Sequence, residues 1–260
     1  VYDGDKAYTT TALSGTFYGS AKITKVTLPE SVKGIYHSSF EDCSNLVAVE
    51  GTENVTYIDG QTFLGCSCLT SIDIPLVTTI EVQTFSGCSK LTAVNMPSVS
   101  AISFLAFSGC HALETVDLPK ATSIDLRAFE SCSNLESVNL PMVTSIGNDA
   151  FRGTRITEVI LPATLQSLGY GNFVSAAKIV LGSVTPPALS TGSNGGGFSS
   201  TTTLMVPELS LAAYKSADVW NKYAGQMLSQ SDVVDYDVTT TAQDNTSGLH
   251  DVIPLMVTTL

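Results

Sequence analysis

Cysteine is the residue type whose spacing in this chain most resembles a chemical site. Five of the six cysteines recur every 22 or 23 residues, at Cys43, Cys66, Cys88, Cys110 and Cys132. Regularly spaced thiols could ligate a metal, form disulfides or fill a small apolar space. Zinc is not expected, because Cys66 and Cys68 would point to opposite faces of an extended segment and no histidine lies nearby in the repeat. We expect buried, reduced thiols, with disulfides between stacked coils as the open alternative.

The three histidines do not complete a site. His37, His111 and His250 occupy unrelated positions in the pattern, and His111 takes a turn position that holds serine in most copies. The sequence lacks G-x-S-x-G, H-E-x-x-H and a phosphate-binding loop, since the glycine run at 195–197 has no Lys-Ser or Lys-Thr after it. Acidic residues recur at regularly spaced surface positions, which suits solubility at least as well as acid-base catalysis. We therefore expect no catalytic residues, no cofactor and no metal site.

The cysteines belong to a longer repeat that phenylalanine marks most clearly. Eight of the ten phenylalanines are spaced by 22 or 23 residues, at Phe17, Phe40, Phe63, Phe85, Phe107, Phe129, Phe151 and Phe173. Aliphatic residues keep the same rhythm five positions before each phenylalanine from Phe40 onward. Such regularity indicates stacked copies of one structural unit, because a single copy cannot bury its own apolar face.

Each copy has the pattern of a short coil that contains one strand. Leu69, Ile72 and Ile74 have the spacing L-x-x-L-x-L, in which alternate side chains point inward. A proline that ends strand pairing follows in five copies, at Pro75, Pro97, Pro119, Pro141 and Pro162. We predict a leucine-rich repeat solenoid: a right-handed coil with one parallel β-sheet face, about 7–8 repeats of 22–23 residues and a C-terminal cap. Neighbouring strands would lie about 4.8 Å apart.

The consensus L-x-x-V-x-L-P-x-V-x-x-I-x-x-x-A-F-x-G-C-x-x resembles the BspA-like leucine-rich repeat family, also known from treponemal surface proteins. The resemblance covers residues 10–182. It departs from the pattern at Gly51-Thr52, which replace Leu-Pro, and after Cys132, where the cysteine is lost. Such departures are expected of terminal repeats that act as caps. The resemblance implies a cell-surface protein, with an origin in a gut Bacteroidetes-like bacterium.

Three regions are predicted. Residues 1–182 form the repeat array with its N-terminal cap, 183–228 a C-terminal capping segment, and 229–260 a β-rich tail or the start of a following module. The capping segment resembles the closing segment of BspA-like proteins from gut Bacteroidetes. Within it, 204–206 is expected to be a strand and 209–216 a short helix. Trp220 and Tyr223 would cover the open end of the core, because aromatic side chains bury a large area.

A binding face can be predicted from the alternation of side chains along each strand. The outward residue before the last inward position is Glu50, Asp73, Asn95, Asp117 and Asn139 in successive copies, and Ile160 after a one-residue shift. The outward residue two positions earlier is small in most copies, including Ser71, Thr115 and Ser137. These two rows leave room for a partner that the acids and amides could hydrogen-bond. Neither row contains an aromatic platform for sugar stacking, and the alternative is a face that is merely soluble.

Composition limits the possible partners. The chain carries 12 basic and 24 acidic residues, a formal net charge of -12. Nucleic acid and anionic membrane surfaces are not expected as partners, because both require clustered Lys and Arg. No apolar run of about 18 residues is present, so direct membrane insertion is not expected. Low lysine with abundant Ser and Thr favours an extracellular or cell-surface location, although no signal peptide opens the sequence.

Three functional classes remain open. The family resemblance implies an adhesion or interaction module that binds host or bacterial surface proteins without catalysis. The alternative is a carbohydrate-binding module or a passive spacer in a surface protein that handles glycans. An enzyme or an enzyme inhibitor is the third class, and no motif in the sequence favours it.

Overall fold

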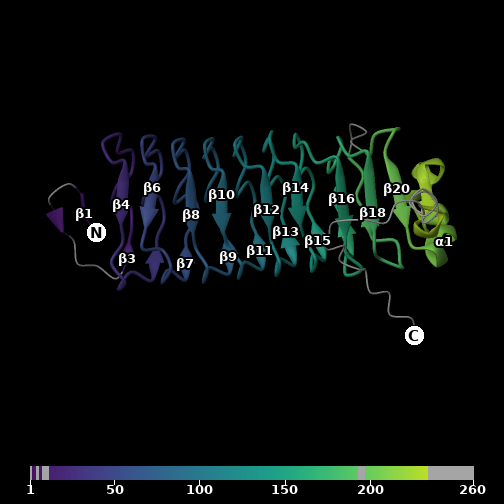
Figure 1. The fold of residues 1–260 in the computed structure, drawn as a ribbon, viewed down its shortest axis with the longest axis horizontal. Helices are drawn as coiled ribbons and strands as arrows, with labels where there is room; N and C mark the ends of the chain where they lie inside the picture. Colours follow the sequence, from purple (N-terminus) through teal and green to yellow (C-terminus); the bar gives the residue numbers. More distant parts are fainter. Residues whose placement is uncertain (1, 4–5, 8–11, 193–196, 234–260) are drawn as a thin grey trace, which may run out of the picture.

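The computed structural model describes residues 2–3, 6–7, 12–192 and 197–233, which form an elongated solenoid (Figure 1). The chain makes about nine turns and contains little helix. The predicted leucine-rich repeat solenoid is confirmed. The stack of coils continues beyond Phe173. Strands of the last coils still pair with one another, although these coils lack the phenylalanine that marks the earlier ones.

One row of parallel strands runs along the solenoid (Figure 1). It consists of β4 (Lys25–Thr27), β6 (Ala48–Glu50), β8 (Ser71–Asp73), β10 (Ala93–Asn95), β12 (Thr115–Asp117), β14 (Ser137–Asn139), β16 (Glu158–Leu161), β18 (Lys178–Leu181), β20 (Thr203–Val206) and β21 (Met227–Ser229). The second residue of the strands from β4 to β18 is a valine or isoleucine that points inward, and these β-branched side chains suit a pleated strand. We call the outward surface of these strands the strand face.

Hydrogen bonding divides this row into three sheets. They are β4–β6–β8–β10, β12–β14 and β16–β18–β20–β21. The breaks fall between β10 and β12 and between β14 and β16. The second break matters for the candidate site, because a surface depression lies over it.

A second row of parallel strands lies on another side of the coil, which the sequence did not predict. It consists of β3 (Ala12–Leu13), β5 (Gly34–Ile35), β7 (Tyr57–Ile58), β9 (Thr79–Ile80), β11 (Ala101–Ile102), β13 (Ser123–Ile124), β15 (Ser145–Ile146), β17 (Ser167–Leu168) and β19 (Ala188–Leu189). In each of these strands from β5 to β17, the isoleucine or leucine is buried. We call the outward surface of this row the second face. Near the N-terminus, β1 (Tyr2–Asp3) pairs with β2 (Lys6–Ala7) in an antiparallel manner.

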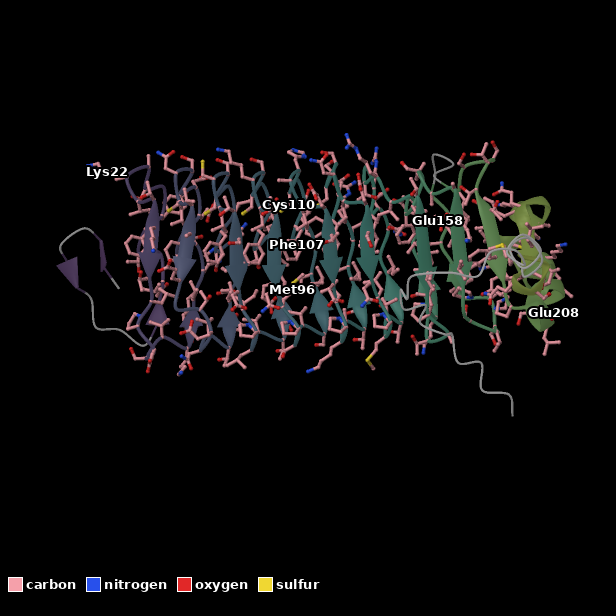
Figure 2. All side chains as sticks on the ribbon, viewed as in Figure 1. Lys22, Met96, Phe107, Cys110, Glu158 and Glu208 are labelled. Atoms are coloured by element: carbon pink, nitrogen blue, oxygen red, sulfur yellow. The ribbon has the colours of Figure 1, made fainter. Side chains whose placement is uncertain are left out.

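The phenylalanines form one continuous stack through the core. From Phe17 to Phe173, neighbouring ring centroids lie 5.0–5.4 Å apart. The ring planes diverge by no more than 19°. Every ring between the two ends contacts one ring on each side, so the core is a column that each additional coil lengthens (Figure 2 labels Phe107 at its middle).

The repeated cysteines fill the space beside this column, and their predicted burial is confirmed. All six cysteines are free. Each of the five buried thiols donates a hydrogen bond to the carbonyl of a phenylalanine in the preceding coil, as Cys66 Sγ does to Phe40 O at 2.9 Å. Burial raises the pKa of Cys43 to about 11 and raises the pKa of Cys88 further. The thiols of Cys43 and Cys88 therefore remain protonated at neutral pH, and each can donate its hydrogen bond to the preceding coil.

The residue before each cysteine adopts a positive φ angle. At Gly65, Gly87 and Gly109 the angle is 73° to 76°, a conformation that glycine adopts at little cost. Asp42 and Ser131 occupy the same position with φ of 57° and 61°. The Gly-Cys pair of the consensus thus combines a backbone requirement at the turn with a thiol that reaches the neighbouring coil.

A helical segment closes the C-terminal end (Figure 1). It contains η1 (Glu208–Ser210), α1 (Leu211–Ser216), η2 (Trp220–Gln226) and η3 (Gln230–Val233). The Trp220 ring is buried, its Nε1 donates to Pro187 O at 2.7 Å, and Tyr214 packs edge-on against it. The α-helix begins at Leu211 rather than Leu209, because Leu209 lies in the preceding 3-10 turn with its side chain 98% exposed.

The region boundaries at 182 and 228 stay predictions, and most of the predicted tail lies outside the described residues.

Candidate interaction face

The strand face carries all eight residues that the sequence singles out. Glu50, Asp73, Asn95, Asp117, Asn139, Ser71, Thr115 and Ser137 are exposed residues at the ends of strands β6 to β14. Each strand of three residues places its first and third side chains outward and its middle side chain in the core. Their location is therefore a direct consequence of strand alternation.

The acids and amides of this face are paired between coils. Asn95 Nδ2 donates to Asp73 Oδ1 at 2.7 Å, and Asn139 Nδ2 donates to Asp117 Oδ1 at 2.7 Å. Glu50 forms an ion pair with Lys25 at 2.6 Å. One carboxylate oxygen of each aspartate is thus occupied by a neighbouring coil. The row presents fixed amide–carboxylate pairs rather than independent charges.

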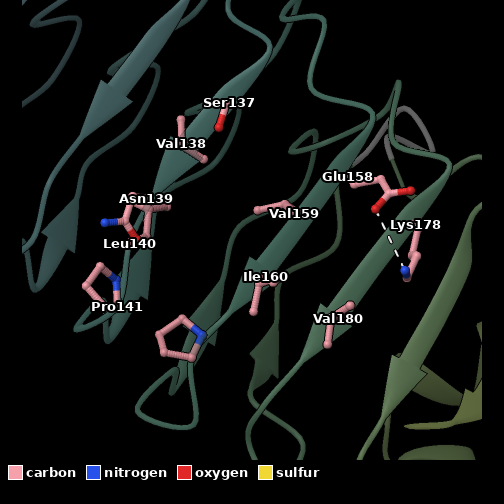
Figure 3. A pocket seen from close by; sticks show the side chains of 11 residues that line it. Ser137, Val138, Asn139, Leu140, Pro141, Glu158, Val159, Ile160, Lys178 and Val180 are labelled. Atoms are coloured by element: carbon pink, nitrogen blue, oxygen red, sulfur yellow. Dashed lines mark ion pairs between the residues drawn. The ribbon is translucent and has the colours of Figure 1, made fainter. Parts of the chain in front are cut away.

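A depression of about 410 Å³ interrupts the face over the break between β14 and β16. Its lining comes from β14, β16, β18 and the turns that follow β14 and β16. Figure 3 shows Ile160 on β16 between Asn139 on β14 and Val180 on β18. Ile160 is 73% exposed, a large apolar side chain on a face that is otherwise mainly polar. Pro141 and Pro162 extend the apolar lining.

Polar groups surround this apolar lining. Ser137 and Asn139 stand on the β14 side, and the ion pair between Glu158 and Lys178 closes the other side at 3.7 Å. The depression can therefore accept an apolar side chain while hydrogen-bonding groups contact the polar atoms around it. This combination of an apolar centre and a polar rim is typical of protein-binding sites.

The depression lies at the first turn of the array in which the spacing of the inward strand residues falls below 22 residues. Phe129 and Phe151 keep the 22-residue spacing, whereas the inward valines Val138 and Val159 are 21 residues apart. The missing residue falls in the turn around Arg155, whose backbone N–H donates to Leu135 O at 2.9 Å. Strands β14 and β16 belong to different sheets and do not pair with each other. Strands β16 and β18 pair over four residues.

Only part of this site could be predicted from the sequence. Of the eight predicted residues, Ser137 and Asn139 line the depression, and the other six lie elsewhere along the face. Lys178, Val180, Pro141 and Pro162 were not predicted as site residues. The available signal was the one-residue shift that brings Ile160 into the outward row.

Other classes of site have little basis in the described part of the chain. No group of three or more His, Cys, Asp or Glu side chains among the described residues could hold a metal ion. His111 is exposed in a turn, with Nδ1 2.9 Å from Ser131 O, as expected for a solvated turn residue. None of the described helices has the length and apolar character needed to cross a membrane.

Several solved structures share the fold. A leucine-rich cell surface protein from Faecalibacterium prausnitzii is 24% identical with a TM-score of 0.63, over 80% of this chain and 72% of that chain. A leucine-rich repeat protein from Eubacterium ventriosum is 29% identical with a TM-score of 0.54, over 67% of this chain and 47% of that chain. A leucine-rich repeat protein from Bacteroides ovatus is 22% identical with a TM-score of 0.50, over 88% and 72%. No curated protein matches the sequence.

The repeat itself matches a defined family. The family described as BspA type leucine rich repeat region (6 copies) matches residues 7–81 and 61–180. These residues include the phenylalanine column, the cysteine row and the strand face up to β18. Leucine-rich repeat solenoids of this kind are typically non-catalytic modules for protein interaction. The chain belongs to the BspA-type leucine-rich repeat family.

Proposed function

We propose that this chain is a non-catalytic interaction module at the cell surface that binds a host or bacterial surface protein through its strand face. The observation that carries the proposal is the depression between β14 and β16, where an exposed isoleucine meets a polar rim. The family, whose solved relatives include a cell surface protein, supports the location and the general role.

The size and lining of the depression favour one inserted side chain of a protein partner. Its volume of about 410 Å³ falls within the range of about 300–1,000 Å³ found for ligand pockets. Contact energy at protein interfaces concentrates in a few central residues that a rim shields from water. Ile160 would be such a residue, and Asn139 would orient the partner by hydrogen bonds.

The charge of the chain favours a cationic partner. The formal net charge is -12, and Asp73 on β8 and Asp117 on β12 lie on the strand face, on the N-terminal side of the depression. Opposite charge on the partner would accelerate association, an effect that salt screens. The paired amides keep the aspartates in fixed positions, so a basic segment would meet an ordered row of acceptors.

The test is a binding screen against purified extracellular-matrix proteins and bacterial surface proteins, followed by variants of the strand face. Ile160→Asp should weaken binding of any protein found by about tenfold or more, as loss of a central apolar contact does. The double variant Asp73→Lys/Asp117→Lys should weaken binding and change its salt dependence, because it reverses the charge of the face.

The control is the double variant Glu53→Lys/Asp125→Lys, which makes the same charge change at exposed positions outside the strand face. It should leave the affinity within about twofold of the parent, apart from the effect of net charge. A screen in which no protein binds would contradict the proposal and favour a passive spacer. Binding that survives both strand-face variants would place the site on another surface.

A further inference from the structure

Two exposed tyrosines form a separate feature on the second face, in the coils nearest the N-terminus. Tyr57 is the first residue of β7, and Tyr36 directly follows β5. Each side chain is 41% exposed. Their ring centroids lie 5.6 Å apart and their planes are inclined by 51°. The two rings therefore contact each other while both remain open to solvent.

A glycine gives the two rings their arrangement. Gly34 on β5 is the register partner of Tyr57 on β7, so no side chain stands beside Tyr57 at this position. A Cβ at residue 34 would lie 2.8 Å from Tyr36 Cε2, which means that the Tyr36 ring lies over Gly34. The ring thus takes the space that another residue would fill.

Polar groups fix the second ring. Tyr57 Oη donates to Asp59 Oδ1 at 3.2 Å, and the same carboxylate oxygen accepts the Gly60 N–H at 2.8 Å. Partial burial, with the carboxylates of Asp59 and Glu81 nearby, raises the pKa of Tyr57. The Tyr57 hydroxyl therefore stays protonated at neutral pH, and the Asp59 carboxylate accepts its hydrogen bond.

The repeat itself does not require these tyrosines. The position of Tyr57 is filled in later coils by small residues, namely Thr79, Ala101, Ser123, Ser145, Ser167 and Ala188. Those coils pair in parallel in the adjoining six-stranded sheet, β9 to β19, without an aromatic residue. A pair of large, half-exposed rings confined to two coils is therefore an addition to the fold, and exposed aromatic residues with adjacent hydrogen-bonding groups are suited to recognition.

We propose that Tyr36 and Tyr57 form a binding site for a neutral glycan chain. Each ring would stack against the apolar C–H face of a sugar unit, and the carboxylates of Asp59 and Glu81 would accept hydrogen bonds from sugar hydroxyls. Because the planes of the two tyrosine rings are inclined by 51°, the pair is better suited to two successive sugar units than to a single sugar unit. The carboxylates would repel glycans that carry sulfate or uronate groups.

The test measures binding of the purified protein to neutral hexasaccharides of glucose, xylose, mannose and galactose by calorimetry. Heparin and polygalacturonate serve as anionic comparisons, and the corresponding monosaccharides as the single-unit comparison. We expect at least one neutral hexasaccharide to bind, with weaker or no binding of the monosaccharide. The double variant Tyr36→Ala/Tyr57→Ala should lose about tenfold or more in affinity, because stacking on both rings is removed.

Gly34→Ala is the sharper variant because it keeps both tyrosines. The added methyl group displaces the Tyr36 ring from its position over residue 34, so glycan affinity should fall while the aromatic content is unchanged. Tyr18→Ala is the matched control, since Tyr18 is 60% exposed but is not part of the ring pair. Thermal melting of each variant checks that the solenoid remains folded.

The outcomes separate this site from the strand face. Ile160→Asp should leave glycan binding unchanged, and the double tyrosine variant should leave protein binding unchanged. Absence of binding by every neutral hexasaccharide would overturn the glycan proposal. The same conclusion follows if the double tyrosine variant retains full glycan affinity, or if it loses a protein partner instead.

Discussion

At the scale of single residues, the phenylalanine column carries much of the stability of each coil. Phe107 is fully buried, with the rings of Phe85 and Phe129 at 5.2 and 5.1 Å on its two sides. Replacing it by alanine leaves a cavity inside a stack that cannot close without moving whole coils. We expect Phe107→Ala to lower the free energy of unfolding by about 3–5 kcal/mol.

Urea unfolding followed by circular dichroism measures this change, with Tyr18→Ala as a control that removes an exposed ring. Repeat arrays can unfold in parts, so hydrogen exchange around β9 to β13 identifies the coils that the substitution destabilises. An unchanged melting temperature would contradict the place assigned to Phe107 in the core.

The buried thiols predict a dependence of stability on pH. Burial raises the pKa of Cys43 from 9.0 to about 11, and it also raises the pKa of Cys66 and of Cys88. The native protein therefore keeps protons that the unfolded chain releases above about pH 9. Stability should be independent of these thiols below that pH and should fall as pH rises toward 11, by up to about 1.4 kcal/mol per thiol and pH unit.

The measurement compares urea unfolding at pH 7 to 10 in the presence of a reductant. Lysine and tyrosine also titrate in this range, so the informative quantity is the difference between the parent and Cys66→Ala/Cys88→Ala. We expect the double variant to be less stable at neutral pH but to lose less stability on going to pH 10. Parallel pH curves for the two proteins would contradict the raised thiol pKa values.

At the scale of elements, the turn before β16 separates a regular array from a modified one. The turn from the cysteine position to the inward strand residue spans six steps from Cys132 to Val138 and five from Thr154 to Val159. The depression appears at this change. Strand pairing also stops between β10 and β12, where the spacing stays at 22 residues, so a break in the ladder alone does not account for the exposed Ile160.

We expect insertion of one serine after Thr154 to restore the spacing and extend strand pairing from β14 to β16. Backbone amides of β16 should then gain protection from hydrogen exchange, and a partner that binds the depression should lose affinity. The same insertion after Ser200, in an exposed loop, is the control. If the backbone amides of β16 exchange at the same rate in the variant and in the parent, the length of this turn does not determine whether the depression forms.

At the scale of the whole molecule, the solenoid holds two surfaces of different character on different sides of one coil. The strand face combines paired acids and amides with one apolar depression, and the second face carries the tyrosine pair over Gly34. Both surfaces rest on the same phenylalanine column, so a rigid core fixes each of them. The capping segment with Trp220 covers the end of that core and keeps it from exposing apolar area.

The sequence by itself determined which side chains point inward and which point outward. The 22-residue spacing of phenylalanine, cysteine and isoleucine identifies the core, and alternation along each strand places Asp73 and Asn95 outside. These features are local and are repeated in many copies, so each copy supports the same interpretation. The leucine-rich repeat fold and the exposed strand face follow from them.

The tertiary structure decided how neighbouring coils align, which no single copy of the repeat specifies. The second row of strands, the hydrogen bond from Asn95 to Asp73 and the contact between Tyr36 and Tyr57 all depend on the register between coils. The depression beside Ile160 likewise requires the positions of β14, β16 and β18 together. Contacts between residues about 20 positions apart arise only when the stack forms, because each coil then supplies the surface on which the next one packs.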